Sequence, residues 1–175
     1  SEDDPTEVDG IDAEILRSLT TALEDLRRSR TEEGDRLERI ITDQLSSLET
    51  LRSKAHACDG ARVEQIRDRI SAQLAELLEV PSSLPEERLA QEVAILATKA
   101  DVREEIDRIG AHCEAMRELL VAAEPVGRRL DFLCQELNRE ANTLCSKSTT
   151  DALTKIGLAS KAAIDQIREQ AQNVE

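Results

Sequence analysis

Apolar side chains recur at alternating intervals of three and four residues along most of the chain, which is the pattern of amphipathic helices. The first stripe begins at Ile11 and is interrupted near Gly60. A second stripe of the same kind follows and continues to Leu78. Two long helices joined by a short turn form an antiparallel hairpin. We therefore expect a coiled-coil-like hairpin over residues 11–80, preceded by an acidic linker at residues 1–10.

The second part of the chain repeats the helical pattern after a turn at Pro81. We expect one helix that begins near Ser83 or Leu84, carries its apolar stripe from Leu89 and reaches Pro125. Gly127 opens another helix, and a last one follows the cluster SKSTT. No apolar alternation of period two competes with these helices. The sequence therefore predicts an all-α fold, with a long antiparallel hairpin followed by a three-helix bundle in a C-terminal domain at residues 81–175.

Composition supports helices and limits the surface that nucleic acid can contact. Aromatic residues make up 1% of the chain, a single Phe, so the core consists of Leu, Ile, Val and Ala, which suits helices better than sheets. The formal net charge of -14 argues against phosphate binding over the whole surface. The charge is uneven, because the first fourteen residues carry seven acids and no base, whereas residues 127–147 hold four bases against three acids. A basic footprint is therefore confined to the later segment.

The four cysteines form no C-x-x-C pair and match no zinc-ligand spacing. We interpret Cys58, Cys113, Cys134 and Cys145 as reduced thiols of a cytoplasmic protein. No apolar run has the length of a membrane span and no signal peptide is present, so we expect no membrane partner. The chain starts without Met in an acidic stretch, as we expect of the later part of a longer protein.

The expected third helix carries a polar stripe at positions spaced by four, three and four residues. It consists of Asp101, Glu105, Arg108 and His112. At about 100° per residue, these side chains share one face. Such a stripe can hold a hard divalent cation through its acids and supply an acid or base through its imidazole. A solvated face with ion pairs one turn apart would show the same spacing, so both interpretations stay open. We assign no functional role to the other histidine, His56.

The helix expected from Gly127 to Lys147 is unusually polar. One broad face consists of Arg128, Asp131, Gln135, Asn138 and Asn142. Asn is a mediocre helix residue, so two in one helix need a reason. Recognition of phosphate, ribose or base edges would supply one. Hydrogen bonding across a helix–helix or subunit interface would supply another, and the residue pattern alone does not choose between them.

The same segment matches a known signature. GRRLDFLCQELNREANTLCSKS, at residues 127–148, closely resembles the signature of the YicC/YloC family of bacterial endoribonucleases. IDQIREQAQNVE, at residues 164–175, looks like that family's C-terminus, and ADVREEIDRIGAH, at residues 100–112, is similar to its acidic helix. The resemblance extends over nearly the whole chain, although family members carry a further N-terminal domain ahead of this region.

The resemblance implies an endoribonuclease that cleaves single-stranded or structured RNA with Mg²⁺ or Mn²⁺ and assembles as a homo-oligomer, for which the family suggests a hexamer. It also implies roles for individual residues. The metal ligands would be Asp101, Glu104 and Glu105, and the catalytic residues His112, Asp131 and Glu136. The RNA-binding residues would be Arg128, Arg129, Asn138, Arg139, Asn142 and Lys147.

The corresponding mechanism would use a carboxylate-bound metal to polarise the phosphate, His112 as acid or base, and arginines to stabilise the developing charge. A fragment without the N-terminal domain would, on this view, be inactive if that domain is needed for substrate binding. Two non-catalytic alternatives fit the same helices. One is an oligomerisation module with a polar subunit contact, and the other is an adaptor whose Leu-rich seam binds a partner helix.

Overall fold

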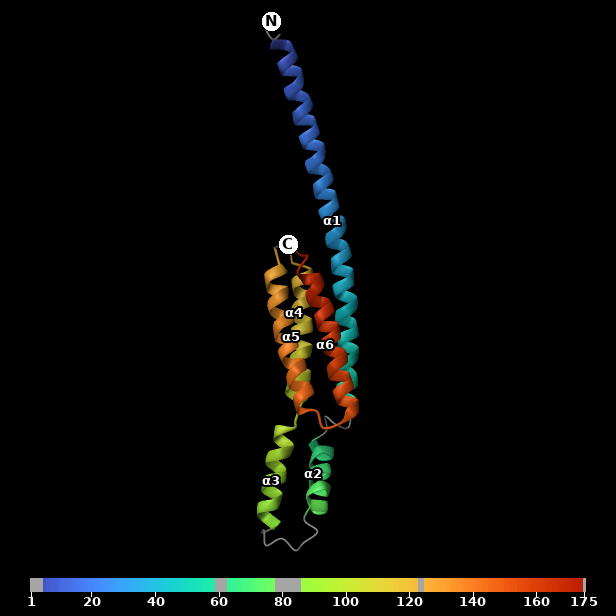
Figure 1. Cartoon of the computed structure of the whole chain (residues 1–175), viewed down its shortest axis with the longest axis vertical. Helices are drawn as coiled ribbons and strands as arrows, with labels where there is room; N and C mark the ends of the chain where they lie inside the picture. The colour runs from blue at the N-terminus through green and yellow to red at the C-terminus, as the bar shows by residue number, and fades with distance from the viewer. Residues whose placement is uncertain (1–4, 59–62, 78–85, 123–124, 175) are drawn as a thin grey trace. The chain divides into compact units, whose positions relative to one another are not determined.

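All regular structure in the described residues is helical. The computed structural model describes residues 5–58, 63–77, 86–122 and 125–174. The helices are α1 (Pro5–Ala57), α2 (Val63–Leu77), α3 (Glu86–Lys99), α4 (Arg103–Leu120), α5 (Gly127–Lys147) and α6 (Asp151–Ala171) (Figure 1). The all-α prediction is therefore confirmed. The predicted interruption near Gly60 and the turn at Pro81 lie outside the described residues.

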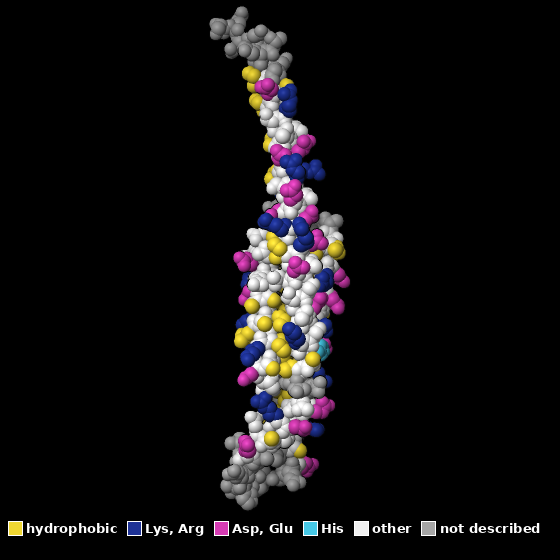
Figure 2. All heavy atoms as spheres, turned by 90° about the vertical axis from the view of Figure 1, so that its right-hand side faces the viewer, with side chains coloured by type: hydrophobic (Ala, Val, Ile, Leu, Met, Phe, Trp, Pro, Cys, Tyr) yellow, Lys and Arg dark blue, Asp and Glu magenta, His cyan; other side chains and the backbone are white. Residues whose placement is uncertain are grey.

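The chain divides into two compact units, residues 1–39 and residues 40–175. In the first unit, α1 begins at Pro5, inside the segment predicted as a linker. Its large apolar side chains are 52–63% exposed. They are Ile11, Ile15, Leu16, Leu19, Leu23 and Leu26. Hydrophobic side chains are visible at the surface of α1 in Figure 2, between acidic and basic ones. Such a stripe is typical of a helix that packs against another helix.

The second unit is organised around one apolar core, which α4, α5, α6 and the last turns of α1 share. Helix α5 packs against both α4 and α6, so the predicted three-helix bundle is present. Several core side chains are completely buried, and within each helix they recur at helical spacing. They include Leu45 and Leu48 of α1, Ile106 and Met116 of α4, Leu130 and Leu137 of α5, and Ile164 and Ile167 of α6.

The helix pairing in the first part of the chain differs from the simple hairpin that the sequence predicts. The helix that packs along α2 is α3. The last turns of α1 contact α4 instead, where Arg117 donates two hydrogen bonds to Glu49, at 2.8 and 3.1 Å. Arg52 also donates to the backbone carbonyl of Ile106, at 3.0 Å. From Ile41 onward, the apolar side chains of α1 are therefore part of the core of the second unit.

The sequence predicts one continuous helix whose apolar stripe begins at Leu89 and which reaches Pro125, but the structure breaks it between α3 and α4 and ends α4 at Leu120. The break occurs at Asp101, whose carboxylate accepts the backbone N–H of Arg103 at 3.0 Å. Short acidic side chains compete in this way with the helical hydrogen bonds of the backbone. The hydrogen bonds from the Arg103 side chain also lower the pKa of Asp101. Asp101 therefore precedes α4 and is not part of its helical stripe.

The boundary between α5 and α6 lies where the Ser/Thr cluster predicts it. Thr150 caps α6, because its hydroxyl accepts the backbone N–H of Leu153 at 3.2 Å.

All four cysteines are free. Burial raises the pKa of Cys113 to about 12 and that of Cys134 to about 11, so both remain protonated in the core. In the part of the chain that the structure describes, no helix is long and apolar enough to cross a membrane.

Gly127 is required where the start of α5 meets the C-terminal residues, because a Cβ at this position would overlap the carbonyl oxygen of Val174. We expect Gly127→Ala to lower the free energy of unfolding by about 1–3 kcal/mol, since the backbone at Val174 must move. Gly34→Ala is the matched control, because nothing lies within 4 Å of a Cβ at Gly34. It should leave stability equal or slightly higher. Equal thermal unfolding of the two variants would contradict the packing described.

Candidate functional site

Two carboxylates are buried in the seam between α4 and α5. Glu105 on α4 and Glu140 on α5 each expose only 5% of their surface. Both stand next to apolar core residues, Ile106 and Ala141, which are fully buried. A charged group in such a position costs free energy unless an opposite charge and hydrogen bonds compensate it. The cations that pair with these two acids therefore mark the candidate functional site.

Glu105 is paired with Lys147, which lies near the C-terminal end of the signature at residues 127–148. The Lys147 Nζ donates to Glu105 Oε1 at 2.8 Å and to the backbone carbonyl of Asp101 at 3.2 Å. The ammonium group remains partly accessible, with 31% of the side chain exposed. The second carboxylate oxygen of Glu105, Oε2, is buried and accepts no hydrogen bond from the described residues. One buried acceptor is thus left unsatisfied beside a partly exposed cation.

Glu140 is paired with Arg108 across the same seam. The Arg108 Nη1 donates to Glu140 Oε1 at 3.4 Å, and the Arg108 Nη2 donates to Glu104 on the preceding turn of α4. The Glu140 side chain is 7% exposed, whereas that of Arg108 is 55% exposed. The guanidinium group is therefore held from behind by a buried acid and from the side by an exposed one.

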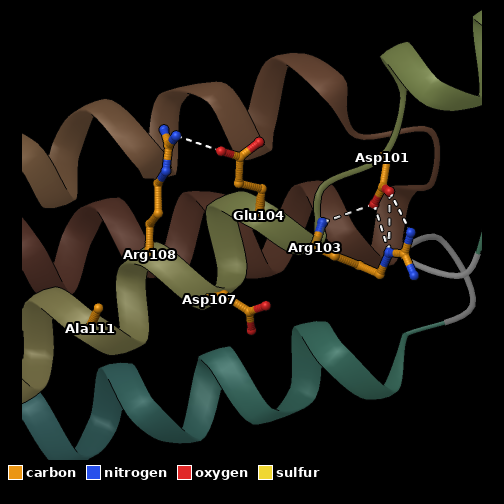
Figure 3. A pocket seen from close by; sticks show the side chains of 6 residues that line it. All are labelled: Asp101, Arg103, Glu104, Asp107, Arg108 and Ala111. Carbon is orange, nitrogen blue, oxygen red and sulfur yellow. Dashed lines mark hydrogen bonds and ion pairs between the residues drawn. The ribbon is translucent and has the colours of Figure 1, made fainter.

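An open hollow of about 610 Å³ lies beside these pairs, on the side of α4 shown in Figure 3. Its polar lining residues form ion pairs with one another: Asp101 turns toward Arg103, with a closest approach of 2.8 Å, and Glu104 turns toward Arg108. Asp107 points toward α1, where it lies 3.0 Å from His56. The hollow therefore presents alternating charges and no excess of free carboxylates.

The three predicted metal ligands do not converge. Asp101 is bound to Arg103, Glu104 to Arg108 and Glu105 to Lys147, so each acid holds a different cation. Within the described ranges, no group of three His, Cys, Asp or Glu side chains is arranged to hold a metal ion. Hard divalent cations need several oxygen ligands at one point. These three residues therefore do not fit a magnesium or manganese site in this chain.

The predicted catalytic residues lie on two helices, His112 on α4 and Asp131 and Glu136 on different faces of α5. Asp131 lies toward α6, where it accepts hydrogen bonds from Arg168 at 3.3 Å and from Gln135 at 2.7 Å. Five residues of an α-helix turn through about 500°, so Glu136 points about 140° away from Asp131. His112 follows Arg108 by one turn of α4, and Glu136 precedes Glu140 by one turn of α5. Because the two helices are antiparallel, both positions lie on the same side of the Arg108–Glu140 pair. The register therefore places His112 opposite Glu136, and Asp131 elsewhere.

The predicted RNA-binding residues also separate into groups. Asn138 donates to Asp165 of α6 at 3.1 Å, and Asn142 donates to Asn138 at 2.9 Å. These two amides therefore contribute to the α5–α6 interface, which was one of the two interpretations of the polar face. Arg139 is exposed, and Arg128 and Arg129 lie at the opposite end of α5 from Lys147.

Sequence reasoning missed the two features that are most informative in the structure. Glu140 was not among the candidate site residues, although it is buried and holds Arg108. The only Phe, Phe132, is 59% exposed rather than part of the core. An acid directly beside a core position, such as Glu140 before Ala141, is the signal that the sequence offered for the first feature.

Comparison with known proteins agrees with the sequence resemblance. Residues 56–175 match the family described as "Endoribonuclease YicC-like, C-terminal". The chain is 38% identical over 169 residues to a probable endoribonuclease YicC of Clostridioides difficile (strain 630), covering 94% of this chain. It is 36% identical over 169 residues to a probable endoribonuclease YicC of Haemophilus influenzae, covering 97% of this chain. The matches span 58% of the length of each of these relatives. The chain therefore belongs to the YicC-like endoribonuclease family, whose C-terminal region it contains.

Proposed function

We propose that this chain is the part of an endoribonuclease that holds the RNA backbone along the outer side of the α4–α5 seam. The observation that carries the proposal is that two buried acids, Glu105 and Glu140, each hold a cation at the surface of this seam. Buried ion pairs stabilise a fold little compared with apolar residues of the same size. Their value here is that Lys147 and Arg108 are fixed in place before a phosphate arrives.

The proposal is consistent with the charge of the chain. A net charge of -14 repels RNA in general, so binding has to occur where cations are held at defined positions. Arg108 is 55% exposed, and its exposed partner Glu104 is 69% exposed, so a phosphate can replace Glu104 without uncovering the buried Glu140. Arginine binds phosphate oxygens through paired N–H groups, which suits it to this exchange.

For the chemical step we propose transesterification at the RNA 2′-hydroxyl, with His112 and Glu136 as the acid–base pair. One of them removes the 2′-OH proton while that oxygen forms a bond to phosphorus, and the other donates a proton to the departing 5′-oxygen. Arg108 stabilises the charge that develops on the phosphate oxygens. The metal dependence that the resemblance implies is assigned to no residue of this chain, because Asp101, Glu104 and Glu105 do not converge.

A second role, self-assembly, has its own observation. The first unit exposes a stripe of six large apolar side chains along α1, with coiled-coil spacing. We propose that this stripe packs against another copy of α1 in a homo-oligomer. A purely structural module would need this stripe but would not need cations held by buried acids, so the seam favours an RNA-binding enzyme over an assembly module.

Arg108→Ala should weaken binding of a labelled RNA by about 10-fold or more, because a charge-assisted hydrogen bond to phosphate contributes about 1.5–3 kcal/mol. The slope of log affinity against log salt should become shallower by about 0.7, the value for one phosphate contact on a single strand. Fluorescence anisotropy at several salt concentrations measures both. Arg36→Ala is the matched control, since Arg36 forms an exposed ion pair with Glu33 on α1. Equal affinity of the two variants would contradict the proposal.

His112→Ala should reduce single-turnover RNA cleavage by about 100-fold or more while RNA affinity changes little, because an acid–base residue acts on the chemical step. His56→Ala is the control, since His56 lies on α1, pairs with Asp107 and takes no part in the proposed step. An equal loss of RNA affinity in His112→Ala, or cleavage at the wild-type rate, would show that His112 does not perform this role.

A further inference from the structure

We propose that Phe132 forms a stacking platform for one unpaired RNA base, in a groove at the opposite end of the seam from Lys147. This inference rests on the proposed function, because it names a further subsite for the same RNA strand. The groove has a volume of about 580 Å³. It is lined by Ala115, Glu118, Leu119 and Ala122 of the α4 side and by Arg128, Arg129, Phe132 and Leu133 of α5.

The exposure of Phe132 is the first observation. It is the only aromatic residue of the chain, and it is 59% exposed while smaller apolar side chains fill the core. The ring is not an isolated exposed side chain, because it lines one groove together with Leu119 and Leu133. An apolar groove of this kind is typical of a binding site for a ligand or partner. Leu119 and Leu133 supply an apolar floor beside the ring, since Leu119 is 6% exposed and Leu133 is partly buried against the core.

The charges around the ring indicate which occupant fits. Arg128 and Arg129 precede Phe132 by four and three residues, so all three side chains lie on one side of α5. The first turn of α5 contains no acid, and Glu118 is the one acid among the residues that line the groove. An aromatic ring with neighbouring arginines is the arrangement by which proteins bind single-stranded nucleic acid, the ring stacking on a base and the arginines contacting phosphates.

The position of the groove connects it with the cations of the candidate site. The groove is lined by residues of the α4 side and of α5, and the Arg108–Glu140 ion pair joins the same two helices, which pack against each other. Phe132 precedes Glu140 by eight residues on α5, a separation of about 12 Å along the helix. Glu136 lies on the turn of α5 between them, and the helix register places His112 of α4 opposite it. A short RNA strand that stacks one base on Phe132 therefore passes His112 and reaches Arg108, with the scissile phosphate between the two ends.

The test compares Phe132→Leu with Phe132→Tyr in the whole chain. The probe is a single-stranded oligoribonucleotide that carries 2-aminopurine, whose fluorescence is quenched when the base stacks. Phe132→Leu keeps an apolar side chain but removes stacking, so we expect affinity to fall by about 5- to 150-fold and the quenching to be lost. Phe132→Tyr should retain both. A blunt duplex of the same sequence should bind wild type and Phe132→Leu equally, because its bases are already stacked.

Three results would overturn the inference. If Phe132→Leu binds the single strand like wild type while Arg108→Ala still weakens binding, the stacking subsite is wrong but the proposed function stands. If Phe132→Leu instead lowers the mass of the assembly in analytical ultracentrifugation and leaves RNA binding unchanged, the groove docks a second copy of the chain. If neither variant affects RNA affinity, the proposed function itself fails.

Discussion

The burial of two carboxylates in an apolar seam is the constraint on which the functional interpretation depends. Glu105 and Glu140 lie among side chains that exclude water, so each must be met by a cation from the facing helix. This requirement determines the register of α4 against α5, because Lys147 has to reach Glu105 while Arg108 reaches Glu140. The same register aligns His112 with Glu136 one turn farther along. Packing and candidate chemistry therefore have a single cause.

The seam also separates residues that look equivalent in the sequence. Arg108 and Lys147 are held from behind and keep an exposed side, whereas Asn138 is used within the chain by Asp165 of α6. Asp131 is likewise engaged by Arg168. One face of the polar helix α5 thus packs against α6. Another face packs against α4 and lies along the path that we propose for RNA. The interface interpretation therefore applies to the face toward α6, and the site that we propose lies on the face toward α4.

Much of the fold is predictable from the sequence because apolar periodicity is a local property. The bounds of α5 follow from the stripe between Gly127 and Lys147, and the start of α6 follows from the Ser/Thr cluster. The break at Asp101 was missed, because a stripe of three and four residues continues through it while a single side-chain hydrogen bond ends the helix. Pairing of α2 with α3 was missed because apolar stripes show that a helix has a partner without showing which one.

The site was only partly predictable for a related reason. Spacing placed Glu105, Arg108 and His112 on one face, but ion pairs with residues 32 to 42 positions away decide which acids are available. The family resemblance placed the candidate residues on α4 and α5 and suggested a metal cluster that Asp101, Glu104 and Glu105 do not form. The most direct test of the account is an NMR titration of the ¹⁵N-labelled chain with a short single-stranded RNA. We predict shifts concentrated in residues 105–119 of α4 and 128–147 of α5. Shifts confined to α1 and α6, or no saturable shifts, would contradict it.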